Sequence, residues 1–172
     1  GAAAALAAAR DGLKVALVEA REPPRWRADE PDLRVVAFAP DNAALLDDLG
    51  VWGAVRSARA MPYRRMRVWD AAGGGELCFD ADAIGRAELG HIVENVLLAD
   101  RLWAACAREA GISRHCPATV ESLAQEEDMA TLGLSDGGVL HARLVLGADG
   151  AGSGLRTLAG LEAPTHDYGQ RG

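Results

Sequence analysis

The sequence has few of the residues that mark disulfide-rich, metal-binding or nucleic-acid-binding proteins. Its three cysteines are an odd number without a C-x-x-C pair, which predicts neither a disulfide framework nor a zinc site. The four histidines are scattered and make no metal-binding pattern. Lysine and arginine total 18 against 25 for aspartate and glutamate, and the net charge of -7 argues against nucleic acid as a partner.

Long apolar runs are also missing from the sequence. No run approaches the roughly 18 residues that a membrane span needs. The alanine-rich start lacks the basic region of a signal peptide and is interrupted by Asp11 and Glu19, so we expect reduced thiols and a cytoplasmic location. The 172 residues are 49% hydrophobic and 25% charged, which is typical of a folded protein the size of one domain.

Helices are predicted where helix-forming residues dominate, or where apolar residues recur at a spacing of three to four. Asp41 or Asn42 is expected to cap the second helix, and Gly111 is expected to end the last one. The predicted helices cover 1–11, 40–50, 52–58 and 95–110.

The sequence predicts strands of two kinds, which differ in the pattern of their apolar residues. Residues 14–19, KVALVE, form an apolar run of the kind buried on both faces of a parallel sheet. Residues 65–70 and 76–80 alternate polar and apolar side chains around a glycine-rich turn, which predicts an antiparallel pair with one solvated face. Further strands are expected at 118–125, 129–135 and 139–147.

The opening residues are typical of half of a dinucleotide-binding unit. Such a unit needs glycines before its helix, so that backbone amides can approach a pyrophosphate, and an acid at the end of its second strand for the ribose. Gly1 stands where the last glycine of G-x-G-x-x-G would stand, and Glu19 ends the next strand at close to the expected spacing of about 20 residues. An alanine-rich surface helix followed by a solvated glutamate is the alternative.

A second glycine-rich turn, GADGAGSG, follows the apolar residues 144–146 and leads into a short helix. Glycines let a backbone pass close to a ligand, and Asp149 is placed to accept hydrogen bonds there. A strand, turn and helix in which Asp149 acts only as a cap is the alternative.

Six segments resemble a known enzyme family in their amino-acid sequence and in their order along the chain. Together they resemble the FAD-dependent aromatic-ring monooxygenases typified by p-hydroxybenzoate hydroxylase, and more narrowly the bacterial ubiquinone-biosynthesis hydroxylases of the UbiH/UbiF/VisC group. The segments are LKVALVEA, LRVVAFAPDNAALLDDLGVW, PYRRMRVWDA, ELGHIVENVLLADRLW, LVLGADGAGSGLR and DYGQ.

The resemblance implies an α/β fold, with a partial Rossmann-like FAD-binding domain and an inserted antiparallel β subdomain on the substrate side. The implied organisation is 1–60 for the first part of the FAD-binding domain, 61–92 for the substrate-side segment, 93–160 for the second FAD-binding part, and 161–172 for the start of a substrate domain. The family is about twice as long as this sequence, so we expect the chain to be incomplete at both ends.

The resemblance also assigns roles to matched residues near the adenosine and the pyrophosphate of FAD. Gly1 would be the surviving glycine of the pyrophosphate loop, and Glu19 would bind the ribose. Arg34 falls where the family keeps an arginine against the pyrophosphate, a task that suits a permanently charged side chain able to bind two oxygens at once.

Four further residues are matched elsewhere in the implied FAD site. Asn95 aligns with an amide beside the flavin, and it could equally cap the helix that begins there. Asp149 and Gly150 would lie near the pyrophosphate, with Arg156 as a weaker candidate in the same region. The catalytic residues stay unknown, because the chemistry in this family belongs mostly to the cofactor, and no metal is expected.

The implied activity is hydroxylation of the aromatic ring of a polyprenylated ubiquinone precursor, a quinol or phenol, with NAD(P)H as reductant and O2 as oxidant. The polyprenyl tail implies work at a membrane surface or in a ubiquinone-biosynthesis complex, and therefore a cytoplasmic protein that can be peripheral at the inner membrane. There are two alternatives. One is another FAD-dependent oxidoreductase or halogenase of the same fold, and the other is a non-catalytic nucleotide-binding remnant.

Overall fold

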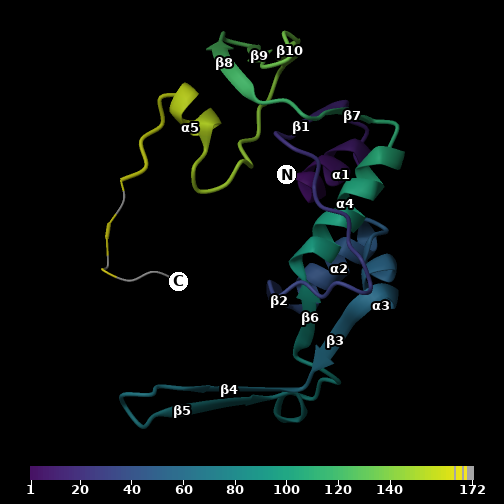
Figure 1. The fold of residues 1–172 in the computed structure, drawn as a ribbon, viewed down its shortest axis with the longest axis vertical. Coiled ribbons are helices and arrows are strands. Elements are labelled where there is room, and N and C mark those ends of the chain that lie inside the picture. The colour runs from purple at the N-terminus through teal and green to yellow at the C-terminus, as the bar shows by residue number, and fades with distance from the viewer. Residues whose placement is uncertain (165, 168, 170–172) are drawn as a thin grey trace. The chain divides into compact units, whose positions relative to one another are not determined.

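The computed structural model describes residues 1–164, 166–167 and 169, and it combines helices with small sheets (Figure 1). Tyr168 and Gln170, from the last matched segment, lie outside the described residues. The four helices predicted from propensity and spacing are confirmed, as is the short helix predicted after the GADG turn, and a short 3-10 turn joins them. The helical elements are α1 (Ala2–Arg10), α2 (Pro40–Asp48), α3 (Trp52–Arg59), η1 (Asp82–Ile84), α4 (Asn95–Arg108) and α5 (Gly154–Leu158).

The strands are short and pair in small groups. β1 (Val15–Val18) lies beside β7 (Ile112–His115); β6 (Gly90–Glu94) lies between β2 (Val35–Phe38) and β3 (Ala60–Tyr63). β4 (Arg65–Trp69) pairs with β5 (Glu76–Asp80), and β9 (Ala130–Leu134) lies between β8 (Val120–Gln125) and β10 (Val139–Ala142). The pairs that involve β6, the β4–β5 pair and the β8–β9–β10 sheet are antiparallel. The sequence predicted the last two groups, whereas β2, β3, β6 and β7 were not predicted.

The chain divides into two compact units, which are described separately below. Unit 1 contains Gly1, Ala16–Glu22 and the part from Ser113 onward, and unit 2 contains Ala2–Val15 and Pro23–Ile112. Unit 1 is built on the β8–β9–β10 sheet, with α5 packed against β8. Unit 2 holds four of the helices, the β2–β6–β3 sheet and the β4–β5 hairpin.

The core of unit 2 forms where α1 and α3 pack on α4 and where β6 lies in the middle of its sheet. The ring of Trp52 stacks on Phe38 with a centroid separation of 5.6 Å and meets the edge of His91 at 5.1 Å. The six largest fully buried side chains all belong to this unit: Leu6, Val51, Val55, Val93, Leu97 and Cys106. β6 is therefore the strand that joins the sheet to the helices.

Helix ends differ from the prediction at two places. Ala39 occupies the cap position of α2 and Pro40 follows it, so neither Asp41 nor Asn42 caps the helix. Proline suits this position because the amide it lacks would have no partner in the first turn.

α4 ends at Arg108, before Gly111 is reached. Gly111 has no left-handed backbone, and its lack of a side chain serves packing instead. A Cβ at this position would lie 3.2 Å from the Cβ of Ala9 and 3.3 Å from the carbonyl oxygen of Leu13.

Two strand predictions need correction. β1 is only half-buried, because its described sheet has a single neighbouring strand, β7, rather than the covered parallel sheet that the apolar run predicted. Residues 144–146 form no strand in the described chain, and β10 ends at Ala142. Leu144 and Leu146 are exposed, since no neighbouring strand offers hydrogen bonds to this segment.

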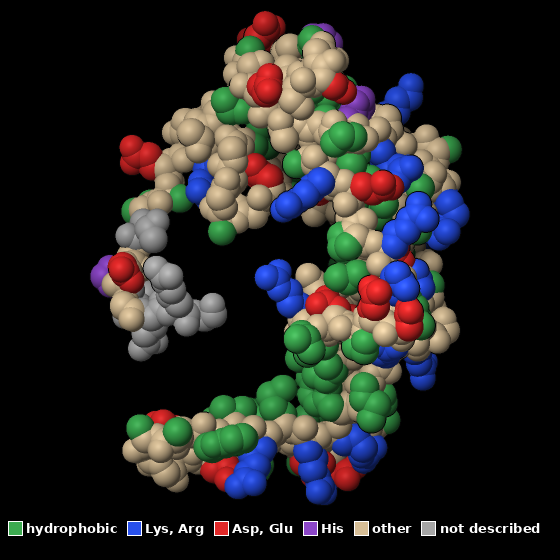
Figure 2. Space-filling model, in the orientation of Figure 1, with side chains coloured by type: hydrophobic (Ala, Val, Ile, Leu, Met, Phe, Trp, Pro, Cys, Tyr) green, Lys and Arg blue, Asp and Glu red, His purple; other side chains and the backbone are tan. Residues whose placement is uncertain are grey.

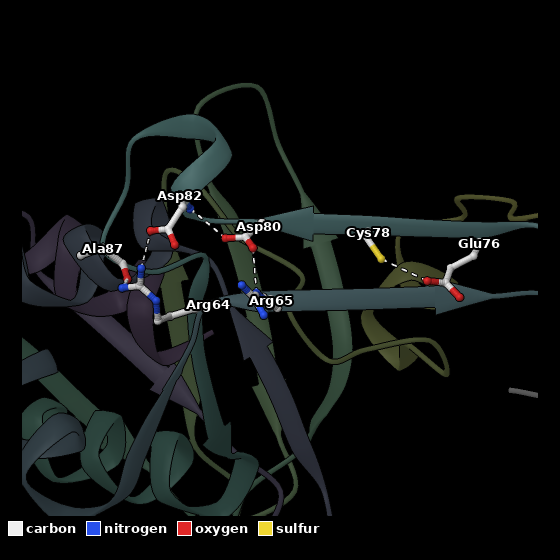
Figure 3. Close-up of polar contacts among 7 residues, drawn as sticks. All are labelled: Arg64, Arg65, Glu76, Cys78, Asp80, Asp82 and Ala87. Atoms are coloured by element: carbon white, nitrogen blue, oxygen red, sulfur yellow. Dashed lines mark hydrogen bonds and ion pairs between the residues drawn. The ribbon is translucent and has the colours of Figure 1, made fainter.

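The β4–β5 hairpin confirms the predicted antiparallel pair, but both of its faces are exposed, whereas the sequence predicted only one solvated face. Arg65 pairs with Asp80 across the strands, and Arg67 reaches Glu76 at 2.6 Å. Figure 3 shows part of this polar face, with Arg64 on Asp82 and on the carbonyl of Ala87 at the base of the hairpin. The opposite face is apolar and exposed, and Figure 2 shows hydrophobic side chains along one side of the hairpin and charged ones along the other. Its residues are Met66, Val68, Leu77 and Phe79.

No helix among the described residues has both the length and the apolar character that a membrane crossing requires.

Candidate functional site

In unit 1, Gly1 lies between β1 and the GADG turn. A Cβ on Gly1 would be 3.6 Å from the Cβ of Ala148 and 4.0 Å from a methyl group of Leu17. The structure therefore brings the first residue of the chain beside the residue that precedes Asp149, although 147 positions separate Gly1 from Ala148 in the sequence. Gly1, the predicted remaining glycine of the pyrophosphate loop, and the GADG turn therefore lie side by side in this unit.

Glu19 directly follows β1, and two backbone hydrogen bonds hold it there. Its amide donates to the carbonyl of His115 at 3.0 Å, and its own carbonyl accepts the amide of Ala118 at 3.0 Å. The side chain is half-buried, and its carboxylate has one long contact, 3.4 Å, from the amide of Arg21. A rigid backbone and a carboxylate with spare acceptor capacity suit a ligand that offers hydroxyl groups.

Asp149 holds the GADG turn together. One of its carboxylate oxygens accepts the hydroxyl of Ser153, and the other accepts the amide of Leu155 at 3.1 Å. The Ser153 hydroxyl, followed by the Leu155 amide, lowers the pKa of Asp149 below its ordinary value of 3.8. Gly150 has a φ of +84°, a conformation that favours glycine.

The cap residue of α5 is Ser153, whose hydroxyl accepts the amide of Arg156 at 3.0 Å, and the Asp149 carboxylate supports it by accepting the amide of Leu155 in the same turn. A cavity of about 410 Å³ lies beside the turn. Asp149, Gly150, Ser153 and Arg156 contribute to its wall, together with apolar side chains from the same unit. Arg156 donates to the carbonyl of Ala151 at 3.1 Å, which turns part of its guanidinium toward the turn itself.

In unit 2, Arg34 and Asn95 are neighbours at the edge of the β2–β6 pair. Val35 is opposite Glu94 in the register, and the amide of Asn95 donates to the carbonyl of Arg34 at 2.9 Å. Both residues are exposed. A guanidinium and a carboxamide are therefore presented to solvent from adjacent backbone positions, although the two residues are 61 positions apart in the sequence.

The cap of α4 comes from Asp32, and the sequence did not indicate it. One oxygen of Asp32 accepts the amide of Arg34 at 2.9 Å, and the other accepts the amide of Val96 at 3.2 Å. Asn95 was predicted to cap this helix, but it is the first helical residue, and Asp32 receives the amide of the next one. Because Asp32 lies 64 residues away from Val96, no local pattern could have revealed this contact.

Glu94, at the cap position of α4, points elsewhere. Its carboxylate accepts the indole N–H of Trp26 and pairs with Arg59 at 2.6 Å, and its side chain is 6% exposed. Two guanidinium groups lie over the Trp26 ring, with the Cζ of Arg59 5.4 Å and that of Arg101 5.3 Å from its centroid. This cluster attaches the long segment after β1 to the end of β6.

The described His, Cys, Asp and Glu side chains form no metal site. Among the residues that the structure describes, no group of three or more His, Cys, Asp or Glu side chains is placed to hold a metal ion.

Several solved structures share the fold of this chain. PqsL of Pseudomonas aeruginosa, solved in complex with 2-aminobenzoylacetate, matches 97% of this chain and 45% of its own with a TM-score of 0.76 and 22% identity. The p-nitrophenol 4-monooxygenase PnpA of Pseudomonas putida matches 92% of this chain and 40% of its own, with a TM-score of 0.72 and 22% identity. The flavin-dependent monooxygenase PieE, solved with FAD and substrate, matches 93% and 30%, with a TM-score of 0.71 and 22% identity. The fold is a mixed α/β fold of the flavin-dependent monooxygenases.

Curated relatives narrow the class. The 3-demethoxyubiquinol 3-hydroxylase of Escherichia coli K12 is 37% identical over 171 residues, which is 99% of this chain and 44% of the relative. Ubiquinone hydroxylase UbiL of Rhodospirillum rubrum is 33% identical over 171 residues, 99% of this chain and 39% of the relative. No family model matches the chain.

The chain is a homologue of the ubiquinone-biosynthesis hydroxylases, and the resemblance predicted from its motifs is confirmed. It spans less than half the length of these curated relatives.

Proposed function

We propose that this chain forms part of the FAD site of a monooxygenase that hydroxylates the aromatic ring of a polyprenylated quinol or phenol in ubiquinone biosynthesis. The observation that carries the proposal is the 37% identity to 3-demethoxyubiquinol 3-hydroxylase, which extends over almost the whole chain. The second relative, UbiL, is named for the same kind of reaction. The proposal includes NAD(P)H as reductant, O2 as oxidant and work at a membrane surface, and the relationship to these hydroxylases is the support for all three.

The residues present fit FAD by the chemistry of their donors and acceptors. In unit 1, Gly1 precedes α1, and Glu19 keeps acceptor capacity for ribose hydroxyls at the end of β1. In unit 2, the exposed Arg34 suits a pyrophosphate, and the exposed Asn95 suits the polar edge of a flavin. When bound, FAD would supply the redox and oxygen chemistry, and these residues would bind and orient it.

Asp149 and Gly150 have a more indirect place in the proposal. The Asp149 carboxylate is engaged by Ser153 and Leu155, so it would act by holding the turn in shape. Gly150 would then let the backbone of this turn approach the cofactor. In this reading the fold is a Rossmann-like FAD-binding domain with the β4–β5 hairpin as an inserted substrate-side segment.

The fold alone does not select the reaction, which is why the sequence relationship carries the proposal. The Diels-Alderase PyrE3 matches 92% of this chain with a TM-score of 0.65, and its name describes a different reaction. Its identity to this chain is 19%, against 37% for the E. coli hydroxylase.

The first experiment tests the cofactor and the reaction together. We expect the purified product of the complete reading frame to show flavin absorbance and to consume O2 with NAD(P)H in the presence of a prenylated quinol precursor. A folded, colourless protein that FAD does not reconstitute would contradict the cofactor assignment. Flavin binding without quinol-dependent hydroxylation would point instead to another oxidoreductase of this fold.

The second experiment tests Arg34. We expect Arg34→Ala to raise the Kd for FAD at least about tenfold, because a charge-assisted bond to a phosphate contributes on the order of 1.5–3 kcal/mol. The Kd is measured by titrating the apoprotein with FAD and following flavin fluorescence. Arg27→Ala is the matched control, since Arg27 is exposed on the same segment and pairs with Asp29 and Glu30. Equal affinity of Arg34→Ala and the wild type would remove Arg34 from the site.

A further inference from the structure

Two backbone segments meet at the carboxylate of Asp32. Its oxygens accept the amide of Arg34 at 2.9 Å and the amide of Val96 at 3.2 Å. Both amides lie at residues proposed to bind FAD. One belongs to Arg34 itself, and the other belongs to Val96, which directly follows Asn95. A third bond, from the amide of Asn95 to the carbonyl of Arg34 at 2.9 Å, closes the connection.

The origin of this arrangement lies in Glu94. The residue at this position normally caps a helix with its own side chain. Glu94 makes no such bond: glutamate is not a favoured cap residue, and its carboxylate is directed to Trp26 and Arg59 instead. The first turn of α4 therefore depends on an acceptor from another segment, and Asp32 provides it.

We propose that Asp32 is a positioning residue, which sets the spacing between the Arg34 guanidinium and the Asn95 amide so that both can engage one FAD molecule. The inference rests on the proposed function. Asp32 acts through its two neighbours, because its carboxylate is occupied by their backbones. A carboxylate suits this task better than a hydroxyl, since it has two oxygens and no proton to donate.

The chemistry of a cap explains the expected size of the effect. The bond from Asp32 to Val96 replaces the one that an N-terminal cap residue would make, and the negative charge lies near the positive end of the helix dipole. Loss of Asp32 removes the acceptor of the Arg34 amide and that of the Val96 amide at the same time, and leaves the bond from the Asn95 amide to the Arg34 carbonyl as the remaining connection. Binding of a ligand by both residues then requires them to be ordered anew.

The experiment uses the apoprotein of the complete reading frame and measures the Kd for FAD by flavin fluorescence. We expect Asp32→Ala to raise the Kd about tenfold. Asp32→Asn keeps one acceptor oxygen and should recover part of the loss. Asp29→Ala, an exposed acid on the same segment, should leave the Kd unchanged.

A general loss of stability is separated from positioning by two further measurements. Ala104→Gly weakens the middle of α4 and lowers the thermal midpoint of the apoprotein, but it should not change the Kd. In the Arg34→Ala/Asn95→Ala background, the additional change Asp32→Ala should alter the Kd less than about twofold, because the residues through which Asp32 acts are already absent.

The outcomes distinguish this inference from the proposed function. A wild-type protein that does not bind FAD overturns both. A wild-type protein that binds FAD while Asp32→Ala binds it equally well overturns the role of Asp32 alone. A full additional loss in the double-variant background would also overturn it, because Asp32 would then act independently of Arg34 and Asn95.

Discussion

At the scale of single residues, the same side-chain type serves different ends in this chain, and its partners decide which. Asp149 and Asp32 both follow the rule that a carboxylate near a helix start accepts backbone amides. Asp149 does so within its own turn, six residues before Leu155. Asp32 does so across 64 residues, which changes it from a local cap into a connection between segments.

The pKa of Asp149 gives a prediction about pH. Its folded-state pKa is lowered, so the ionised carboxylate contributes stability above the ordinary value of 3.8, and this contribution is lost as the pH falls through the folded pKa. We expect Asp149→Asn to lower the thermal midpoint at neutral pH, with a difference from the wild type that shrinks below about pH 4. Thermal unfolding followed from pH 7 to pH 3 measures this.

Asp128→Asn is the control for this prediction, because Asp128 is an exposed residue of the same unit. It should show little difference from the wild type at any pH. A difference between Asp149→Asn and the wild type that is constant over the whole pH range would contradict the role of the ionised Asp149 carboxylate.

At the scale of elements, the junction of β6 and α4 connects the sheet, the helices and the segment after β1 in unit 2. β6 supplies buried side chains to the core and pairs with strands on both sides. At its end, Glu94 fixes Trp26 and Arg59, and the carbonyl of Ala28 accepts a further bond from Arg59. The irregular segment between β1 and β2 therefore obtains its position from contacts with a strand that comes much later in the chain.

Removal of Glu94 should be costly. Glu94 is buried and accepts bonds from Trp26 and Arg59, whereas Arg59 is 38% exposed and stays partly hydrated, so we expect Glu94→Ala to lower the free energy of unfolding by about 2 kcal/mol. The exposed pair of Glu76 with Arg67 offers a matched comparison, and Glu76→Ala should cost less than about 1 kcal/mol. Chemical denaturation of both variants gives the two values. Similar values for the two would show that burial of Glu94 does not decide its contribution.

At the scale of the whole molecule, the chain leaves a large amount of apolar surface uncovered. The apolar face of the β4–β5 hairpin is the clearest case, with Leu77 63% and Phe79 51% exposed (Figure 2). Exposed contiguous apolar faces promote association, because water is released when they are covered. The polar face of the same hairpin is satisfied by its own ion pairs (Figure 3).

This surface predicts how the 172-residue chain behaves by itself. We expect it to bind a hydrophobic dye and to scatter more light as its concentration rises. Replacing the directly opposed pair with Val68→Lys and Leu77→Glu should reduce both signals, because a cross-strand ion pair keeps the hairpin while removing apolar area. Arg67→Lys on the polar face is the control. Unchanged dye binding in the double variant would place the association surface elsewhere.

The sequence by itself determined the helices, part of the strands, the resemblance to the ubiquinone-biosynthesis hydroxylases and the residue types of the candidate site. Propensity and spacing were sufficient for α1 to α4, for the β4–β5 hairpin and for the β8–β9–β10 meander, because the interactions that form these elements lie within a few residues or one turn. The amino-acid sequence of six segments was sufficient to predict the relationship to the ubiquinone-biosynthesis hydroxylases.

Only the tertiary structure decided which of those residues meet. It placed Gly1 beside Ala148, Asn95 beside Arg34, and Asp32 on the amide of Val96. It also showed that 144–146 have no strand partner among the described residues and that Gly111 serves close packing rather than a helix end. These facts depend on contacts between segments far apart in the chain, for which a single sequence carries no local signal.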